Sequence, residues 1–153
     1  MSKKKYCQGI YKPLTGGGYM GRKQPRYLSS WELRFFRWCD HNPSVVKWGS
    51  EAIKVPYVSP IDGKIHNYLV DNIVHLRNKA GLVEKYIVEI KPKKQTLPPK
   101  KHGNKKRSTV LYEHYTYQTN LAKWKAAEEW SKRHRFKFLI LTEDHLFSKK
   151  NNK

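Results

Sequence analysis

Residues 70–91 read VDNIVHLRNKAGLVEKYIVEIK, and this stretch decides the fold. Two segments rich in apolar and β-branched residues flank a polar turn, NKAG at 78–81, so the pattern predicts a β-hairpin. With the turn centred on residues 79 and 80, the numbers of paired residues sum to about 160, within a residue or two. That register places Asp71 opposite Glu89.

Two carboxylates and one amine therefore gather at one end of the predicted hairpin. Side chains alternate along a strand, so Glu89 and Lys91 share one face. Two close carboxylates repel each other unless a cation lies between them, and Mg²⁺ is a cation that binds such pairs. The alternative interpretation is a cross-strand ion pair between Lys91 and either Asp71 or Glu89 on a solvated face.

Composition limits the class of protein. The 153 residues are enough for one domain with a core, and 32 Lys and Arg face only 12 Asp and Glu, a formal net charge of +20. Such a charge indicates a polyanionic partner, nucleic acid or, less readily, an acidic membrane. No apolar run is long enough to span a bilayer, and the N-terminus lacks a secretory signal. Cys7 and Cys39 form no metal-binding pattern, so we expect reduced thiols, a cytosolic protein and no zinc site.

Before the hairpin, the chain is expected to form an arm, a helix and three strands. Residues 1–28 are basic, contain three consecutive glycines and predict an extended arm laid over the domain or onto a partner. A helix then begins after Ser29 and ends at Asn42-Pro43. Strands are expected at 45–48, 53–58 and 64–69, and with the hairpin they predict a run of antiparallel strands.

Glu32 is the third residue of that first helix and lies on its apolar stripe. The Ser29-to-Glu32 spacing is that of a capping box, which explains a glutamate here. The alternative is that Glu32 points into a functional site.

A basic segment follows the hairpin, with no acidic residue between Lys91 and Arg107. Its prolines and glycine exclude a helix from the prediction. We expect it to contact a phosphate backbone without reading sequence, although a solvated loop is the alternative. The candidate contacts are Lys93, Lys94, Lys100, Lys101, Lys105, Lys106 and Arg107.

The C-terminal third predicts a helix, a strand and a short helix. The helix covers 110–134, with its core positions at Tyr117, Leu121, Trp124 and Trp130, and Gln118 is a candidate to reach the site. Residues 136–142 predict a buried strand beside the hairpin, and a short helix at 143–147 is capped by Thr142. Residues 29–147 then form one domain with a mixed sheet flanked by helices, an α+β arrangement within the broad α/β class, and 148–153 form a frayed tail.

The order helix with an acid, hairpin with Asp and Glu-x-Lys, helix, strand resembles the core of the PD-(D/E)xK, restriction-endonuclease-like nucleases. In this resemblance Asp71 matches the motif aspartate, Glu89-Ile90-Lys91 matches E-x-K, and Glu32 matches the acid of the first core helix. The motif prefers proline where this chain has Val70 and an aromatic residue where it has Asn72.

Three segments narrow the resemblance to the head completion nucleases of T-even-type tailed phages and, more distantly, to the endonuclease subunit of cut-and-paste transposases. They are SSWELRF at 29–35, EIKPKKQ at 89–95 and FLILTE at 138–143. The resemblance implies a DNase that depends on Mg²⁺, with Mn²⁺ as a substitute, and that acts on packaged DNA before heads join tails. It further implies head or portal-vertex partners, and a place in the host cytoplasm or the virion head.

By the same resemblance, Asp71 and Glu89 would be catalytic residues that bind the metal, and Lys91 would assist the attack and stabilise the transition state. Glu32 would be an outer catalytic acid. Two other classes remain: a non-catalytic DNA-binding protein of the head or neck with a nuclease fold, and an RNA-binding protein. The acids favour the nuclease, because carboxylates near a phosphate weaken the affinity of a pure polyanion binder.

Overall fold

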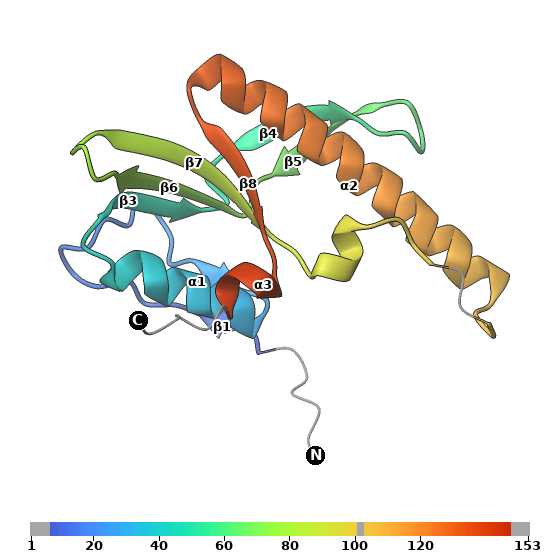
Figure 1. The fold of residues 1–153 in the computed structure, drawn as a ribbon, viewed down its shortest axis with the longest axis horizontal. Coiled ribbons are helices and arrows are strands. Elements are labelled where there is room, and N and C mark those ends of the chain that lie inside the picture. Colours follow the sequence, from blue (N-terminus) through green and yellow to red (C-terminus); the bar gives the residue numbers. More distant parts are fainter. Residues whose placement is uncertain (1–6, 101–102, 148–153) are drawn as a thin grey trace.

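The computed structural model describes residues 7–100 and 103–147. These residues form a mixed α+β domain, so the predicted fold class is confirmed (Figure 1). In chain order the elements are β1 (Gly9–Ile10), β2 (Arg26–Tyr27), α1 (Ser30–His41), β3 (Val45–Ser50), β4 (Lys54–Val58), β5 (Ile65–Leu69), β6 (Asn72–Arg77), β7 (Val83–Ile90), η1 (Lys93–Thr96), α2 (Arg107–His134), β8 (Lys137–Leu141) and α3 (Glu143–Leu146).

The predicted hairpin is the centre of a four-stranded sheet. Strands β6 and β7 pair in the predicted register, with Asn72 opposite Val88 and Ile73 opposite Ile87. Strand β3 adds to β6 in an antiparallel direction, and β8 adds to β7 in a parallel direction, which gives the order β3-β6-β7-β8. A parallel strand beside a hairpin needs a long crossover, and α2 provides it.

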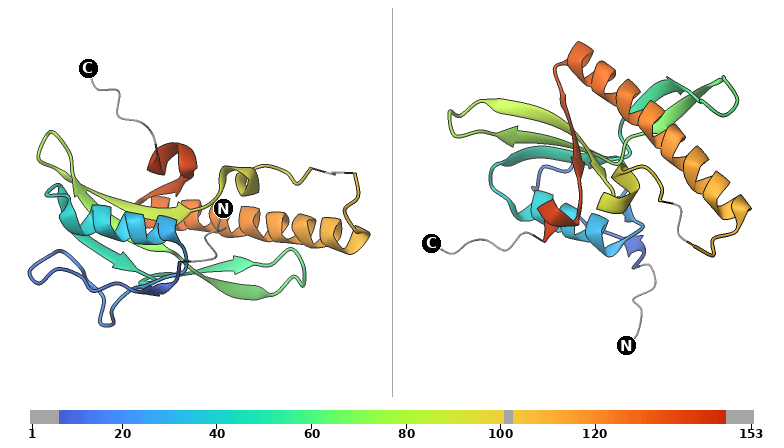
Figure 2. Two further views of the ribbon diagram at one scale, coloured as in Figure 1. Left: turned by 90° about the horizontal axis from the view of Figure 1, so that it is seen from below. Right: turned by 45° about the vertical axis from the view of Figure 1, so that its right-hand side comes forward.

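Each face of this sheet has its own core. On one face Val88 and Ile90 pack with Phe36 of α1 and Trp48 of β3. On the other face Ile87 packs in a second cluster with residues of β4, β5 and α2. Figure 2 shows the sheet between the two long helices. Successive apolar residues of β7 therefore pack alternately into the two cores, as expected of a strand that is buried on both faces.

Strands β4 and β5 do not continue the central sheet, so the predicted single run of antiparallel strands is wrong. They pair only with each other, with Val55 opposite Tyr68, and form a separate two-stranded sheet. Their inner face packs against α2, and Figure 1 shows them extending along that helix. Alternating residues predict that a segment is a strand but do not identify its partner, and here the second core favours the detached pairing.

Three further expectations differ from the structure. Helix α2 begins at Arg107, three residues earlier than predicted, and its buried residues are Asn120, Trp124, Ala127 and Ser131, whereas Leu121 is 39% exposed. The basic segment, predicted without a helix, contains the short 3-10 helix η1. Strand β8 lies beside the hairpin as predicted but is an edge strand with Leu139 41% exposed, because only one neighbour covers it.

The described part of the arm, residues 7–28, lies against α1 and β3. The Gly18 carbonyl accepts a hydrogen bond from the Trp48 amide at 2.9 Å, and the Met20 amide donates to the Trp48 carbonyl at 2.9 Å. The Tyr19 ring lies 4.8 Å from the Trp48 ring, centroid to centroid. The arm thereby covers the outer edge of β3, which would otherwise expose unpaired backbone groups.

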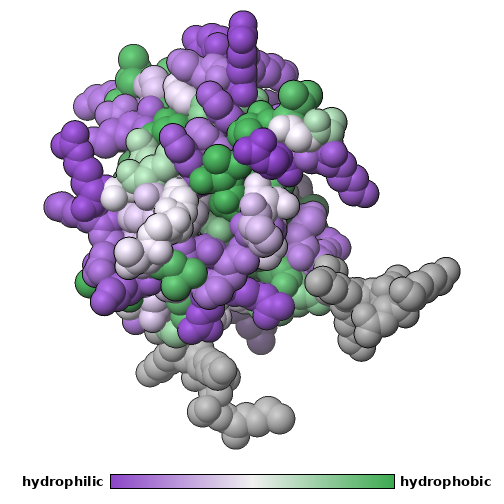
Figure 3. Space-filling view, turned by 90° about the vertical axis from the view of Figure 1, so that its left-hand side faces the viewer, coloured by the Kyte–Doolittle hydropathy of each residue, from purple (hydrophilic) through white to green (hydrophobic). Residues whose placement is uncertain are grey.

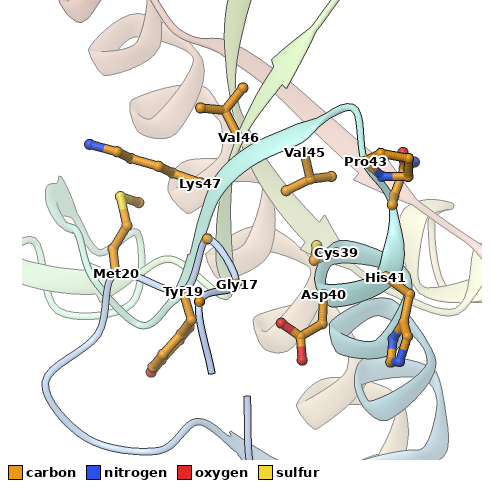
Figure 4. Close-up of a pocket in the computed structure, with 13 residues that line it drawn as sticks. Gly17, Tyr19, Met20, Cys39, Asp40, His41, Pro43, Val45, Val46 and Lys47 are labelled. Atoms are coloured by element: carbon orange, nitrogen blue, oxygen red, sulfur yellow. The ribbon is translucent and has the colours of Figure 1, made fainter. Parts of the chain in front are cut away.

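A hollow of about 790 Å³ lies between the arm, the end of α1 and β3. Figure 4 shows the Asp40 carboxylate pointing from α1 toward the arm. One Asp40 oxygen accepts hydrogen bonds from the Tyr11 hydroxyl at 2.8 Å and the Leu14 amide at 2.9 Å. A side chain at Gly17 would approach the other oxygen to 2.9 Å, and one at Gly18 would collide with the Val46 carbonyl oxygen. The glycine run allows this close approach.

The surface is strongly hydrophilic on the side shown in Figure 3, and apolar residues emerge there only in small separate patches. Within the described residues, no helix combines the length and apolar content that a bilayer crossing requires.

The contact between the arm and β3 gives the first prediction. Gly18→Ala should lower stability by about 1–3 kcal/mol, because the new methyl group must displace the arm or the strand. It should also speed tryptic cleavage after Arg22 and Lys23, measured by mass spectrometry. Gly16→Ala is the control, since open space surrounds that position and its cost is limited to the positive φ of 78°. Equal cleavage of the two variants would contradict the prediction.

Candidate active site

The predicted carboxylate pair comes together where the hairpin ends. Asp71 directly precedes β6, and Glu89 is the second-last residue of β7, so each is the next residue beyond the terminal pair of the hairpin, Asn72 opposite Val88. The Ile90 amide donates to Asp71 Oδ2 over 3.4 Å, a long contact that ties Asp71 to the neighbouring strand. Glu89 is only 4% exposed.

The two acids have unlike surroundings. Glu89 is held on both oxygens: the Tyr68 hydroxyl donates to Oε2, and the Lys91 ammonium lies 3.2 Å from Oε1. Asp71 has the weak Ile90 contact and the neighbouring acid itself. The pKa of Asp71 is raised to about 8, chiefly because the carboxylate is removed from water. Charge repulsion from Glu89 and a hydrogen bond with Glu89 raise it further. Lys91 therefore offsets the charge of Glu89, whereas no cationic side chain among the described residues forms an ion pair with Asp71.

Lys91 completes the predicted trio. It follows β7 directly, and its amide donates to the Leu141 carbonyl of β8 at 2.9 Å, which fixes the backbone at this point. The side chain is 25% exposed, so the ammonium is accessible from outside while one contact holds it to Glu89. An ammonium has three donors, and the remaining ones can reach an anionic ligand.

Glu32 is a half-buried residue at the start of α1. The Ser29 hydroxyl accepts from the Glu32 amide at 3.2 Å, so the N-cap forms as predicted. The Glu32 carboxylate accepts from the Leu28 amide at 2.7 Å, so it caps the chain one residue before the box position. Burial, followed by repulsion from Glu51 and Glu89, raises the pKa of Glu32. Glu32 therefore serves the cap and also lies within the electrostatic range of Glu89.

Two residues at this site are not found from the sequence. Tyr68 is 5% exposed, and burial and the proximity of Glu89 raise its pKa well above the ordinary value, so its hydroxyl remains a donor. Glu51 lies between β3 and β4 with a positive φ of 53°, and its amide donates to the Asp71 carbonyl at 3.1 Å. Nothing in the sequence marks Glu51, and Tyr68 is found only once the packing of the β4–β5 pair is known.

The basic segment begins directly after Lys91 and returns along α2. A groove of about 740 Å³ separates the two, lined among others by Lys94, Lys100 and Lys105. Two of the candidate contacts form exposed ion pairs: Lys93 with Asp144 at 2.8 Å and Lys105 with Glu113 at 2.8 Å. Such pairs contribute about 0–1 kcal/mol, so a phosphate can replace either carboxylate.

The remaining candidates of the basic segment lie on the surface wherever the structure describes them. Lys94, Lys100, Lys106 and Arg107 are exposed, and Lys101 lies outside the described residues. Gln118 is exposed on α2. On the same helix the Lys123 ammonium lies 5.6 Å from the centre of the ring of Tyr68, whose hydroxyl donates to Glu89. Lys123 is thus the α2 side chain that structure, not sequence, connects to the site.

The donor set fits a hard divalent cation. Among the described residues no three His, Cys, Asp or Glu side chains are placed to hold one metal ion together. Two carboxylates with unused lone pairs are nevertheless the protein ligands that Mg²⁺ commonly uses, with water filling its other positions. The raised pKa of Asp71 is the expected result when a half-buried carboxylate converges on a buried one without a cation between them.

Comparison with known proteins gives two matches. A protein-family model described as TnsA-like endonuclease N terminal matches residues 42–143. The chain is also 40% identical over 144 residues to the head completion nuclease of Enterobacteria phage T4, and this alignment covers 90% of the chain and 92% of the relative. The family match contains Asp71, Glu89 and Lys91, whereas Glu32 lies before its first residue.

The repulsion at Asp71 gives a prediction for the metal-free protein. Because the pKa of Asp71 is raised on folding, the folded state binds the extra proton, and stability falls as pH rises from about 4 to about 8. Asp71→Asn should remove this loss, so the variant should have a higher Tm than wild type at pH 8 in EDTA. The difference should shrink toward pH 5, and calorimetric unfolding across this range measures it.

Glu129→Gln, which neutralises an exposed carboxylate on α2, is the control. It should leave Tm nearly unchanged at both pH values, since exposed charges contribute little. A variant at Asp71 that is less stable than wild type at pH 8 would show that the acid forms a net stabilising interaction.

Proposed function

This chain belongs to the TnsA-like endonuclease family, and from that premise we propose that Asp71 and Glu89 bind Mg²⁺ for the hydrolysis of DNA phosphodiester bonds. The protein is a nuclease of phage head completion. The observation that supports the metal site is the converging pair of carboxylates, a buried Glu89 and a half-buried Asp71, in which burial and then repulsion between the acids raise the pKa of Asp71. Mn²⁺ has the same preference for oxygen ligands and is expected to substitute.

The residues of the chain have distinct tasks in this proposal. A divalent ion bound by Asp71 and Glu89 supplies Lewis-acid activation of the phosphate and of the attacking water. Lys91 donates to a phosphate oxygen and stabilises the negative charge that grows as water adds to phosphorus and the P–O bond to the leaving oxygen breaks. Its contact with Glu89 keeps the ammonium oriented before the substrate arrives.

Glu32 has an outer role in this proposal. Its hydrogen bond to Leu28 fixes the carboxylate at the start of α1, and its interaction with Glu89 adds negative charge around the site. More negative charge strengthens the attraction for a divalent cation. We assign it to holding water around the cation.

The basic segment and the surrounding surface would bind the substrate. Its exposed lysines follow Lys91 in sequence, so a DNA phosphate backbone bound by them would lie next to the carboxylates. Such contacts give affinity without reading bases, which suits cleavage with little sequence preference. We further propose that the substrate is packaged phage DNA, acted on before heads join tails. Proteins of the head or portal vertex would then be its partners, and the host cytoplasm its place of action.

The central test is cleavage of supercoiled plasmid. Wild type should cut with Mg²⁺ and not with EDTA, and Asp71→Ala should lower the rate by on the order of 10²-fold or more. DNA binding in EDTA should persist or tighten, because without a divalent ion Asp71 contributes at most a repulsive charge. Asp62→Ala, at the exposed turn of the β4–β5 pair, changes the net charge equally and should cut at the wild-type rate. Gel shifts without cleavage by any protein would favour a binding-only head protein.

The second test concerns the basic segment. Replacing Lys100, Lys105 and Lys106 by Ala should weaken DNA binding and flatten its salt dependence. The log–log slope should fall by about 0.9 for each phosphate that the variant no longer neutralises. Fluorescence anisotropy with a labelled duplex over a range of NaCl concentrations measures this slope.

The control replaces three lysines elsewhere on the surface, Lys79, Lys85 and Lys132, with the same change in net charge. The first two lie at or near the hairpin turn, and the third lies in the last turn of α2, whereas the basic segment follows the end of β7 and leads into the start of α2. An equal decrease of slope in both triple variants would show that the effect is one of total charge and would remove the segment from the binding surface.

A further inference from the structure

The hydroxyl of Tyr68 links two separate sheets at the site. Tyr68 belongs to β5, which pairs only with β4, whereas its hydrogen-bond acceptor, Glu89, belongs to β7 of the central sheet. Apart from Lys91 and the opposing acid Asp71, Tyr68 is the only side-chain partner of the Glu89 carboxylate within the described residues. The β4–β5 pair therefore reaches the carboxylates through one side chain.

The position of the Tyr68 ring is tightly determined. It lies opposite Val55 in the two-stranded sheet and packs in the second core with Ile73, Ile87 and Ala127. The ring is 5% exposed, so neither water nor rotation offers the hydroxyl a different partner at low cost. The packing of the core thus fixes where the donor lies.

The hydrogen bonds of Glu89 leave capacity for a cation. Each carboxylate oxygen has two lone-pair positions, and the Tyr68 and Lys91 contacts use one on each oxygen. The two donors hold the carboxylate in one orientation, and the remaining lone pairs become available once Asp71 is ionised. A metal ligand fixed in this way does not lose rotational freedom when the ion binds.

We propose that Tyr68 is a positioning residue that orients Glu89 for the divalent ion, so that the β4–β5 pair sets the metal affinity of the nuclease. This inference rests on the proposed binding of the metal by Asp71 and Glu89. Partners of this kind commonly change metal affinity by about 10–100-fold when they are removed. Tyr68 contacts Glu89, a proposed metal ligand, and not the substrate. Its removal should therefore change the metal affinity and not the chemical step.

Tyr57 offers a matched control on the same pair of strands. It is the only other tyrosine of β4 and β5, and its ring also lies near the Lys123 ammonium, at 5.8 Å against 5.6 Å for Tyr68. Its hydroxyl makes no hydrogen bond within the part of the chain that the structure describes. Removal of the Tyr57 hydroxyl thus changes the same local surface without changing Glu89.

The experiment measures Mn²⁺ and Mg²⁺ binding to the DNA-free protein by isothermal titration calorimetry. Tyr68→Phe should raise the metal Kd about 10–100-fold, and Tyr57→Phe should leave it within about twofold. In plasmid cleavage, the metal concentration at half-maximal rate should rise in parallel for Tyr68→Phe. The rate at saturating metal should stay near the wild-type value, since Lys91 and both carboxylates remain.

The outcomes separate this inference from the proposed function. A wild-type protein that binds no metal would overturn the metal site itself, whereas wild type and Tyr68→Phe with equal metal Kd would overturn only the role of Tyr68. A Tyr68→Phe variant with a lower Tm and an unchanged metal Kd would likewise limit the hydroxyl to stability. If the variant unfolds in dilute buffer, sucrose, which favours the compact state, keeps it folded for the titration.

Discussion

The register of the β6–β7 hairpin is the constraint on which the rest of the structure depends. A shift by one residue would move every side chain of β7 to the opposite face. Ile87 would then leave the second core, Val88 would leave the first, and Glu89 would enter the apolar layer beneath α1. Such a shift would remove many apolar side chains from the two cores and lose the free energy of their burial. The two cores together therefore keep Asp71 beside Glu89.

How far sequence alone determines this site follows from the range of the interactions involved. The hairpin register, the Ser29 cap and the E-x-K face are local properties, and the structure confirms each of them. The separate β4–β5 sheet, the Tyr68 contact and the approach of Glu51 depend on where distant segments pack. Local alternation predicts the strands of such a segment but not their partners, and for the same reason it does not reveal that β8 is an exposed edge.

Prediction also fails where a residue serves two tasks. Glu32 fits a capping box by spacing, yet its carboxylate accepts from Leu28 and also raises the pKa of Asp71. The predicted buried face of α2 is wrong at several positions for a related reason. The buried residues of this helix include Asn120 and Ser131, while Leu121 is exposed. Helical periodicity locates a buried face only where that face is apolar, and the buried face of α2 is partly polar.

The arrangement of charge resolves an apparent conflict between binding and chemistry. A net charge of +20 attracts DNA, whereas carboxylates at the proposed cleavage point repel it. The structure separates the two in depth: Glu89 is 4% exposed, and the lysines of the basic segment are largely on the surface. Attraction by the exposed cations acts over about 10 Å at ordinary salt. At the acids, the Lys91 ammonium 3.2 Å from Glu89 already offsets one of the two negative charges. A divalent ion bound between the acids, as we propose, would remove the remaining repulsion, so that the same chain could approach DNA by its surface and bind one phosphate at the site.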